Sequence, residues 1–140
     1  MSVMLSDEVR QVVTSGRLAH LATVDPDGSP QVSLVWVGLD GDQIVSAHMA
    51  AWRKVRNIQR DPRVSLTIEA EGRSEQGLDH YLAIQGHAEV VEGGAAPLLQ
   101  RLAHVYLGPD VIFPGVTDPT LGYVVRISAD RVGGVGPWAS

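Results

Sequence analysis

The chain has 140 residues, of which 44% are hydrophobic, 19% charged and 5% aromatic, and at this length one domain is the usual expectation. Its formal net charge of −5 argues against broad binding to nucleic acid or to an anionic membrane surface. The chain contains no cysteine, which excludes disulfides, thiol catalysis and cysteine-ligated zinc or iron–sulfur sites.

The N-terminal region is not typical of a secretory signal, because acidic Asp7 and Glu8 lie where a basic start and an apolar run would be needed. The longest apolar stretch, residues 32–39, is interrupted by Ser33 and Gly38 and is far shorter than the roughly 20 residues that span a bilayer. We therefore expect a cytoplasmic protein with no membrane partner, folded as a single domain over residues 1–140.

The chain opens on the pattern of a short amphipathic helix, in which Ser6 is a typical N-cap and three valines form one apolar face before Gly16. Residues 18–24 are then apolar on both faces and end at Asp25-Pro26-Asp27-Gly28, a strong hairpin turn. Residues 31–37 alternate in character, and a second turn leads into residues 43–48. These three segments predict strands of an antiparallel meander.

In the rest of the chain, segments with the hydrophobic period of a helix alternate with segments with the period of a strand. Residues 50–60 step at helical spacing and end at Asp61-Pro62, which predicts a short helix. Further predicted elements are strands at 63–70, 79–91 and 121–127, a helix at 95–107, a surface loop at 108–119 and a trailing segment at 129–140. Because parallel strands need long crossovers, this mostly hairpin order predicts a mainly β fold, an antiparallel barrel of six strands with peripheral helices.

The cations are concentrated in the predicted helix and just after it. Five of the eleven, including the only lysine, are Arg53, Lys54, Arg56, Arg60 and Arg63. Arg53 and Lys54 fall in the first helical turn, where the helix dipole disfavours a cation by about 0.3–1 kcal/mol. With the free backbone N–H groups of that turn they would form a phosphate cradle, and Arg53, Arg56, Asn57 and Arg60 share one helix face. A solvated cationic face paired with nearby carboxylates is the competing interpretation.

Other motifs carry less information. The five histidines have no metal-binding spacing, so no metal site is predicted. The glycines at 133–136 follow the last predicted strand without a helix behind them, so they do not form a dinucleotide-binding motif. They form either a flexible tail or a loop that lets Trp138 reach a ligand. Trp52 is adjacent to the cation pair, and a planar ligand with a phosphate would explain both tryptophans.

Three stretches of the chain resemble the flavin/deazaflavin oxidoreductase superfamily, the pyridoxamine 5'-phosphate oxidase-like, FMN-binding split β-barrels. They are residues 19–33, with the hairpin motif D-G-x-P-x-V-S, residues 53–65, with R-K-x-R-N before R-D-P, and residues 130–138. The ending Gly134-Val135-Gly136-Pro137-Trp138 resembles the branch that uses the deazaflavin coenzyme F420.

The resemblance implies a homodimer with the cofactor in a cleft lined by both subunits. It implies an F420H2-dependent oxidoreductase that transfers a hydride from the reduced deazaflavin to a conjugated small-molecule acceptor, the cofactor supplying the reactivity. The implied cofactor-binding residues are Gln31, Ser33, Ser46, His48, Met49, Trp52, Arg53, Lys54, Arg56, Asn57 and Trp138.

Two other functions remain open on the same scaffold, an FMN-dependent oxidoreductase and a non-catalytic cofactor- or haem-binding protein. No catalytic residue is identified from the sequence. If a proton donor is needed, Tyr106, His48 and Tyr123 are candidates without a ranking.

Overall fold

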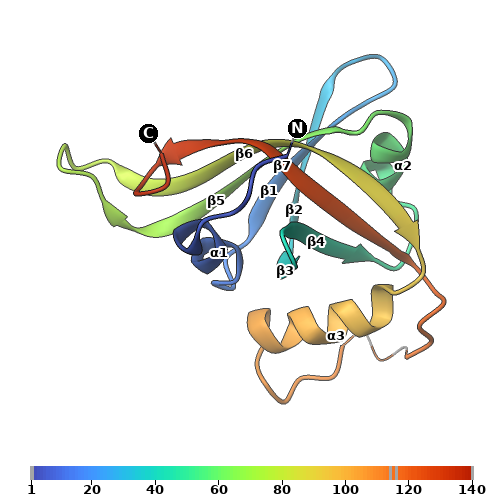
Figure 1. Cartoon of the computed structure of the whole chain (residues 1–140). Coiled ribbons are helices and arrows are strands. Elements are labelled where there is room, and N and C mark those ends of the chain that lie inside the picture. The colour runs from blue at the N-terminus through green and yellow to red at the C-terminus, as the bar shows by residue number, and fades with distance from the viewer. Residues whose placement is uncertain (1, 114, 116, 140) are drawn as a thin grey trace.

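The computed structural model describes residues 2–113, 115 and 117–139. Within these residues the helices are α1 (Asp7–Val13), α2 (Arg53–Arg60) and α3 (Ala95–Tyr106). The strands are β1 (Ala19–Val24), β2 (Pro30–Val35), β3 (Gly38–Asp40), β4 (Gln43–His48), β5 (Arg63–Arg73), β6 (Asp79–Glu92) and β7 (Tyr123–Val135). The strands form one strongly twisted antiparallel sheet in the order β2-β1-β5-β6-β7-β4-β3, with the helices around it (Figure 1).

The predicted mainly β, antiparallel fold is confirmed, but the described residues form seven strands and not six, and the edge strands β2 and β3 do not pair with each other to close the sheet into a barrel. The additional strand, β3, lies in residues 38–40, most of which the sequence assigned to the turn before 43–48, and the predicted strand at 31–37 ends already at Val35. Strand β2 pairs with β1, whereas β3 pairs with β4 at the opposite edge of the sheet. The predicted meander is therefore wrong, because β2 and β4 do not pair.

The chain leaves β2 where Val37 meets a side chain of α3. The backbone N–H of Val37 donates to the hydroxyl of Tyr106, with 3.0 Å between the two atoms, so a residue of α3 takes a group that a continuous strand would use in the sheet. The next residue, Gly38, lies so close to α3 that an added Cβ would be 2.8 Å from a methyl group of Leu102. Contact with α3 thus redirects the chain from one sheet edge to the other.

The predicted trailing segment at 129–140 is the second difference. The last strand, β7, continues to Val135, which pairs with Tyr81 of β6. Gly134 has a φ of +97°, and a Cβ there would lie 2.2 Å from the carbonyl oxygen of Tyr81. Glycine is required at this position because β6 approaches so closely, which explains why a glycine-rich sequence forms a strand here.

The core lies on the inner face of the sheet, where α1 and α2 cover it. The largest fully buried side chains of the sheet are Leu21, Ile44, Leu66, Ile68, Leu82, Ile84 and Ile127. A smaller apolar cluster joins α3 to β4 through Ala47, Ala95 and Leu99, with Trp36 packed against it. Helix α2 contacts β1, β2 and β6, whereas α3 contacts β4 and β7. Residues from the end of β4 line one pocket together with residues of α2 and α3.

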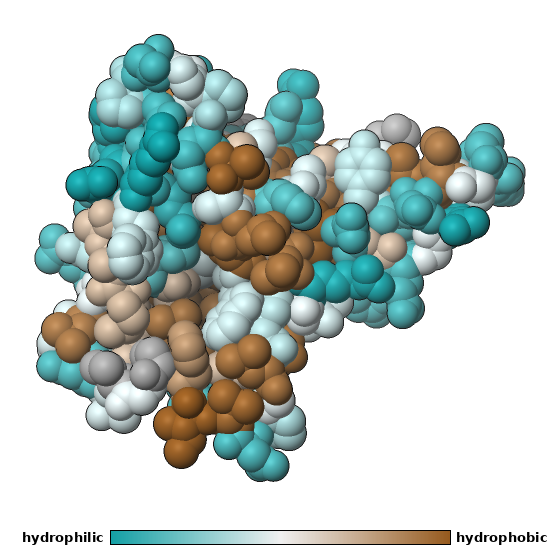
Figure 2. All heavy atoms as spheres, turned by 180° about the vertical axis from the view of Figure 1, so that it is seen from behind, coloured by the Kyte–Doolittle hydropathy of each residue, from teal (hydrophilic) through white to brown (hydrophobic). Residues whose placement is uncertain are grey.

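Apolar side chains are also present on the surface. Figure 2 shows them gathered in the middle and lower part of the face behind the view of Figure 1. Exposed apolar residues of the described chain include Val32 and Leu34 on β2 and Ile112 after α3. None of the helices in the described ranges is long and apolar enough to cross a membrane.

Candidate functional site

A pocket of about 250 Å³ lies between α2 and α3, where β2 and β4 end. It is lined by Leu18, Leu34, Val35, Trp36, Ala47, His48, Trp52, Lys54, Leu99 and Phe113. Eight of these ten side chains are apolar or aromatic, and only His48 and Lys54 carry an ionisable group. The pocket therefore suits a mostly apolar, ring-containing ligand that carries one charged group.

Lys54 is the cation of this pocket. It lies in the first turn of α2, and partial burial lowers the pKa of its ammonium group. The helix begins without a side-chain cap and without an acidic residue in its first turn, so its free N–H groups add positive potential. Within the described residues no ion pair joins Lys54 to a carboxylate. A partly desolvated cation in this setting favours an anionic ligand such as a phosphate.

His48 is the second ionisable group in the pocket. Burial, with a smaller contribution from the charge of Lys54, lowers the pKa of His48 to about 4. The imidazole is therefore neutral at neutral pH. Its Nε2 lies 2.9 Å from the hydroxyl of Ser46, which is also buried on β4. A neutral ring can exchange hydrogen bonds with a ligand, but it adds no positive charge to that of Lys54.

A polar network ties the start of α2 to the end of β1. Asp25 accepts a hydrogen bond from Nε of Arg53 at 2.8 Å, a second from Nη2 of Arg53, and a third from the amide of Asn57 at 2.9 Å. The same Asn57 amide donates to the hydroxyl of Thr23 at 3.0 Å, and Thr23 donates to Oε1 of Gln31 at 2.6 Å. Arg53 and Asn57 hold the pKa of the Asp25 carboxyl below its usual range.

This network shows that Arg53, Asn57 and Gln31, all predicted to contact the cofactor, bind groups of the protein itself. Asn57 is buried, with 2% of its surface exposed, so its amide serves the network. The Arg53 side chain is mostly exposed, and its remaining N–H groups stay available. Arg56 is exposed on the outer side of the same helix.

Three further predicted residues lie around the pocket. Trp52, at the N-cap of α2, is 56% exposed and lines the pocket. Met49 packs beside the pocket against the cluster that joins α3 to β4. The Ser33 hydroxyl is shielded from solvent and has no hydrogen-bond partner among the described residues, which is unusual for a buried polar atom. Ser33 shares a face of β2 with Val35, which lines the pocket.

Trp138 is not brought to this pocket within one chain. Its indole N–H donates to the carbonyl of Gly133 at 3.0 Å, and its ring lies edge-on to His80 at a centroid distance of 6.0 Å. It lines a separate hollow against α1, and the C-terminus lies across the molecule from α2 (Figure 1).

Sequence reasoning missed the α3 side of the pocket. Trp36, which was not among the predicted site residues, stacks on Tyr106 with ring centroids 5.4 Å apart, and the ring of Phe113 lies 5.3 Å from that of Trp36. The Tyr106 hydroxyl donates to the carbonyl of Arg17 at 2.8 Å and accepts from Val37, so its proton is already used within the protein. Only the aromatic residue types at 36 and 113 could have indicated this wall.

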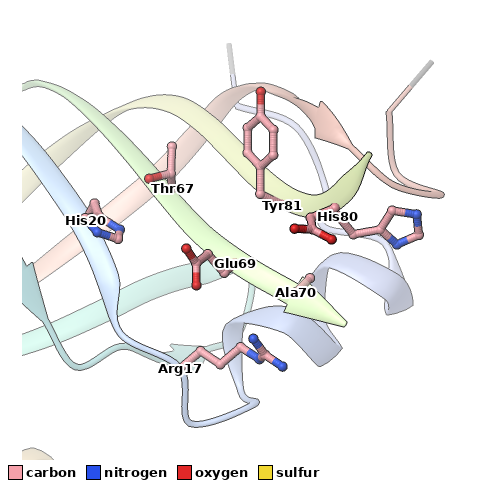
Figure 3. A pocket seen from close by; sticks show the side chains of 8 residues that line it. Arg17, His20, Thr67, Glu69, Ala70, His80 and Tyr81 are labelled. Carbon is pink, nitrogen blue, oxygen red and sulfur yellow. The ribbon is translucent and has the colours of Figure 1, made fainter. Parts of the chain in front are cut away.

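A second hollow, of about 540 Å³, lies on the outer face of β1, β5 and β6 (Figure 3). It is lined by Arg17, His20, Thr67, Glu69, Ala70, Asp79, His80 and Tyr81. It is larger than the first pocket but holds none of the predicted site residues, and its charges are of both signs. The α2–α3 pocket is therefore the stronger candidate for the functional site.

Comparison with known sequences identifies the family. The pyridoxamine 5'-phosphate oxidase family matches residues 5–133, which is most of the chain. The chain therefore belongs to this family, which confirms the resemblance found in its motifs.

Solved structures share the fold over nearly the whole chain. An F420 reductase is 25% identical with a TM-score of 0.72, and the match covers 92% of this chain and 98% of that one. A conserved hypothetical protein from Mycobacterium tuberculosis is 30% identical with a TM-score of 0.70, covering 95% and 85% of the two chains. HupZ from Group A Streptococcus, 18% identical with a TM-score of 0.66 and 98% of both chains covered, shares the fold alone.

The network at α2 predicts a structural role for Asn57. The substitution Asn57→Ala should lower the free energy of unfolding by about 1–3 kcal/mol, because the Asp25 carboxylate and the Thr23 hydroxyl each lose the hydrogen bond that the Asn57 amide donates. Urea denaturation measures this value. Gln59→Ala, at an exposed position of the same helix, is the matched control and should change it by less than about 0.5 kcal/mol. Equal effects of the two substitutions would contradict the assignment.

The lowered pKa of His48 predicts a pH dependence of stability. The unfolded chain binds a proton at His48 near pH 6.5 and the folded chain only near pH 4, so acidification between these values favours unfolding. From about pH 7 to about pH 5, wild type should lose roughly 1–2 kcal/mol more unfolding free energy than His48→Gln. Urea denaturation at both pH values tests this, and parallel losses in the two proteins would show that His48 titrates normally.

Proposed function

We propose that this member of the pyridoxamine 5'-phosphate oxidase family is an F420H2-dependent oxidoreductase that transfers a hydride to a conjugated small molecule. The observation that carries the proposal is Lys54, a partly buried cation without a carboxylate partner among the described residues, in a pocket otherwise lined almost entirely by apolar and aromatic side chains. Such a pocket fits a flat ring system joined to a phosphate. The likeness to an F420 reductase over nearly the full length of both chains supports this choice of cofactor.

The residues present fit such a cofactor. Lys54, the free N–H groups of the first turn of α2 and the remaining N–H groups of Arg53 would hold the phosphate. Trp52 would cover a flat ring, with His48 and Ser46 on β4 at its edge. The Ser33 hydroxyl, which has no partner in the described protein, would gain one. Arg56, which is exposed, would lie beside the side chain of the cofactor beyond its phosphate. Met49 would lie beside the pocket.

When bound, reduced F420 supplies the hydride from C5 of its ring. The protein would hold the phosphate at one end through Lys54, cover the flat ring with Trp52 and keep water away from the reacting atoms. His48 stays neutral and can hold a hydrogen bond at the ring without competing with Lys54 for the phosphate. The Tyr106 hydroxyl, already bonded to backbone groups, takes no part in proton transfer.

We also propose that the protein is a homodimer that completes this site. On the edge strand β2 the outward residues are apolar, since Val32 is 64% and Leu34 is 54% exposed, whereas the opposite face carries Gln31 and Ser33. An edge strand that faces water normally has the reverse pattern. The pocket of about 250 Å³ is also smaller than the roughly 300–1,000 Å³ typical of complete ligand sites.

Leu34 pairs in register with His20, which lines the outer hollow of Figure 3. A second copy that covers Val32 and Leu34 would therefore bring its own surface against both the rim of the pocket and the outer hollow. Trp138, which does not reach the pocket within its own chain, would serve the partner's site in this arrangement.

The central prediction concerns Lys54. The substitution Lys54→Ala should weaken F420 binding by about 1–3 kcal/mol, the range for loss of a charge-assisted contact. Fluorescence titration of the purified protein with F420 and, separately, with FMN measures the affinities. Arg63→Ala is the control, because Arg63 is exposed and paired with Asp61. Tight FMN binding by wild type without F420 binding would favour the FMN-dependent function. Affinities of Lys54→Ala for both cofactors equal to those of wild type would show that Lys54 does not contact the cofactor.

The dimer predicts a second effect. The substitution Leu34→Glu should convert the protein to a monomer, because a charge would be buried at the proposed interface. Size-exclusion chromatography with light scattering measures the mass. Met4→Glu, at another exposed apolar position, should leave the dimer intact. A wild-type monomer at micromolar concentration would refute the dimer without affecting the role of Lys54.

A further inference from the structure

The side chain of Gln100 ties the described part of the loop after α3 to that helix. Its Nε2 donates to the carbonyl oxygen of Val111 at 2.7 Å, and its Oε1 accepts from the backbone N–H of Phe113 at 3.1 Å. Both ends of the amide are therefore used to hold two backbone groups of the loop. Between them, Ile112 is 81% exposed and contributes little packing. The position of Phe113 depends on this amide clamp.

The ring of Phe113 lines the pocket from the α3 side. It lies 5.3 Å from the ring of Trp36, centroid to centroid, at a tilt of 58°, which is a favourable aromatic contact. Trp36 in turn stacks on Tyr106, whose hydroxyl is anchored to the backbone of Arg17 and Val37. Phe113, Trp36 and Tyr106 thus form a continuous aromatic wall that is held at both ends.

This wall and the proposed phosphate site belong to different elements. Lys54 and Trp52 enter the pocket from the start of α2, whereas Leu99 enters it from α3, and Phe113 and Trp36 enter it from the loop after α3 and from the end of β2. Tyr106 does not line the pocket and supports the wall through its stacking on Trp36. The wall carries no ionisable group apart from the phenol of Tyr106, which burial keeps protonated by raising its pKa. With Lys54 engaged by the cofactor phosphate, a charged acceptor would lose hydration at this wall without gaining a partner, whereas a flat apolar molecule would gain contact area.

We propose that Phe113 is a specificity-determining residue of this site: it selects flat, uncharged, conjugated acceptors and limits their width. The inference rests on the proposed function, because it takes the α2 side for the cofactor and leaves the α3 side for the acceptor. Gln100 is a positioning residue, since it does not line the pocket and holds the backbone of Phe113, which does. A quinone is the simplest acceptor of this class. It would take up a hydride and one proton to give the hydroquinone, and F420H2 would lose one hydride and one proton to give oxidised F420, so the two half-reactions balance.

The test compares a narrow and a wide acceptor, 1,4-naphthoquinone and 9,10-phenanthrenequinone, in wild type and three variants. Phe113→Ala should raise KM for naphthoquinone about 5- to 10-fold with a smaller change in kcat, and should shift the preference toward the wider quinone. Gln100→Leu should shift it in the same direction. Ile112→Ala is the matched control in the same loop and should match wild type. Circular dichroism melting confirms that each variant is folded.

A second measurement does not depend on the cofactor. Quenching of tryptophan fluorescence by 1,4-naphthoquinone in the cofactor-free protein should require about 5-fold more quinone in Phe113→Ala than in wild type or Ile112→Ala. The inference would be overturned if Phe113→Ala matched wild type both in quenching and in the ratio of its KM for 1,4-naphthoquinone to its KM for 9,10-phenanthrenequinone. A loss of F420 affinity in this variant without a change in acceptor preference would also overturn it, because the wall would then belong to the cofactor. Failure of wild type to bind F420 would instead refute the proposed function, and the quenching experiment would still decide the role of Phe113.

Discussion

The carboxylate of Asp25 holds the start of α2 against the end of β1. It accepts hydrogen bonds from Arg53 and Asn57, and Asn57 passes the connection on to Thr23 and Gln31. Because a helix of eight residues has little stability of its own, such contacts decide where its first turn lies. The place of Lys54, one residue after Arg53, follows from that anchoring, and so does the direction of the helix dipole toward the pocket.

This anchoring explains how the proposed anion site fits into an acidic protein. Arg53 bonds to Asp25, Arg60 to the carbonyl of Val24 and the side chain of Asn57, and Arg63 to Asp61. These arginines are largely occupied by protein groups, whereas Lys54 faces the apolar pocket. Several arginines of the cationic segment thus serve the architecture of the protein, and the proposed phosphate binding rests mainly on Lys54.

Much of the fold follows from local sequence pattern. The antiparallel β class, the three helices and the hairpin at 25–28 were predicted correctly, because hydrophobic period and turn residues act over a few neighbours. The errors at β3 and β7 have non-local causes. The Tyr106 hydroxyl, far along the chain, takes the N–H of Val37, and β6 approaches Gly134 so closely that only glycine fits.

The same division holds for the candidate site. The sequence by itself determined the family motifs, the cation pair at the start of a helix and the absence of cysteine chemistry, because these are properties of residue type and spacing. Only the tertiary structure decided that Asn57 turns inward to Asp25, that Trp138 lies away from Lys54, and that Trp36 and Phe113 complete the pocket wall. The physical reason is that a side chain takes the direction in which its hydrogen bonds and packing are satisfied. Those partners come from strands and loops that the chain brings together only when it folds.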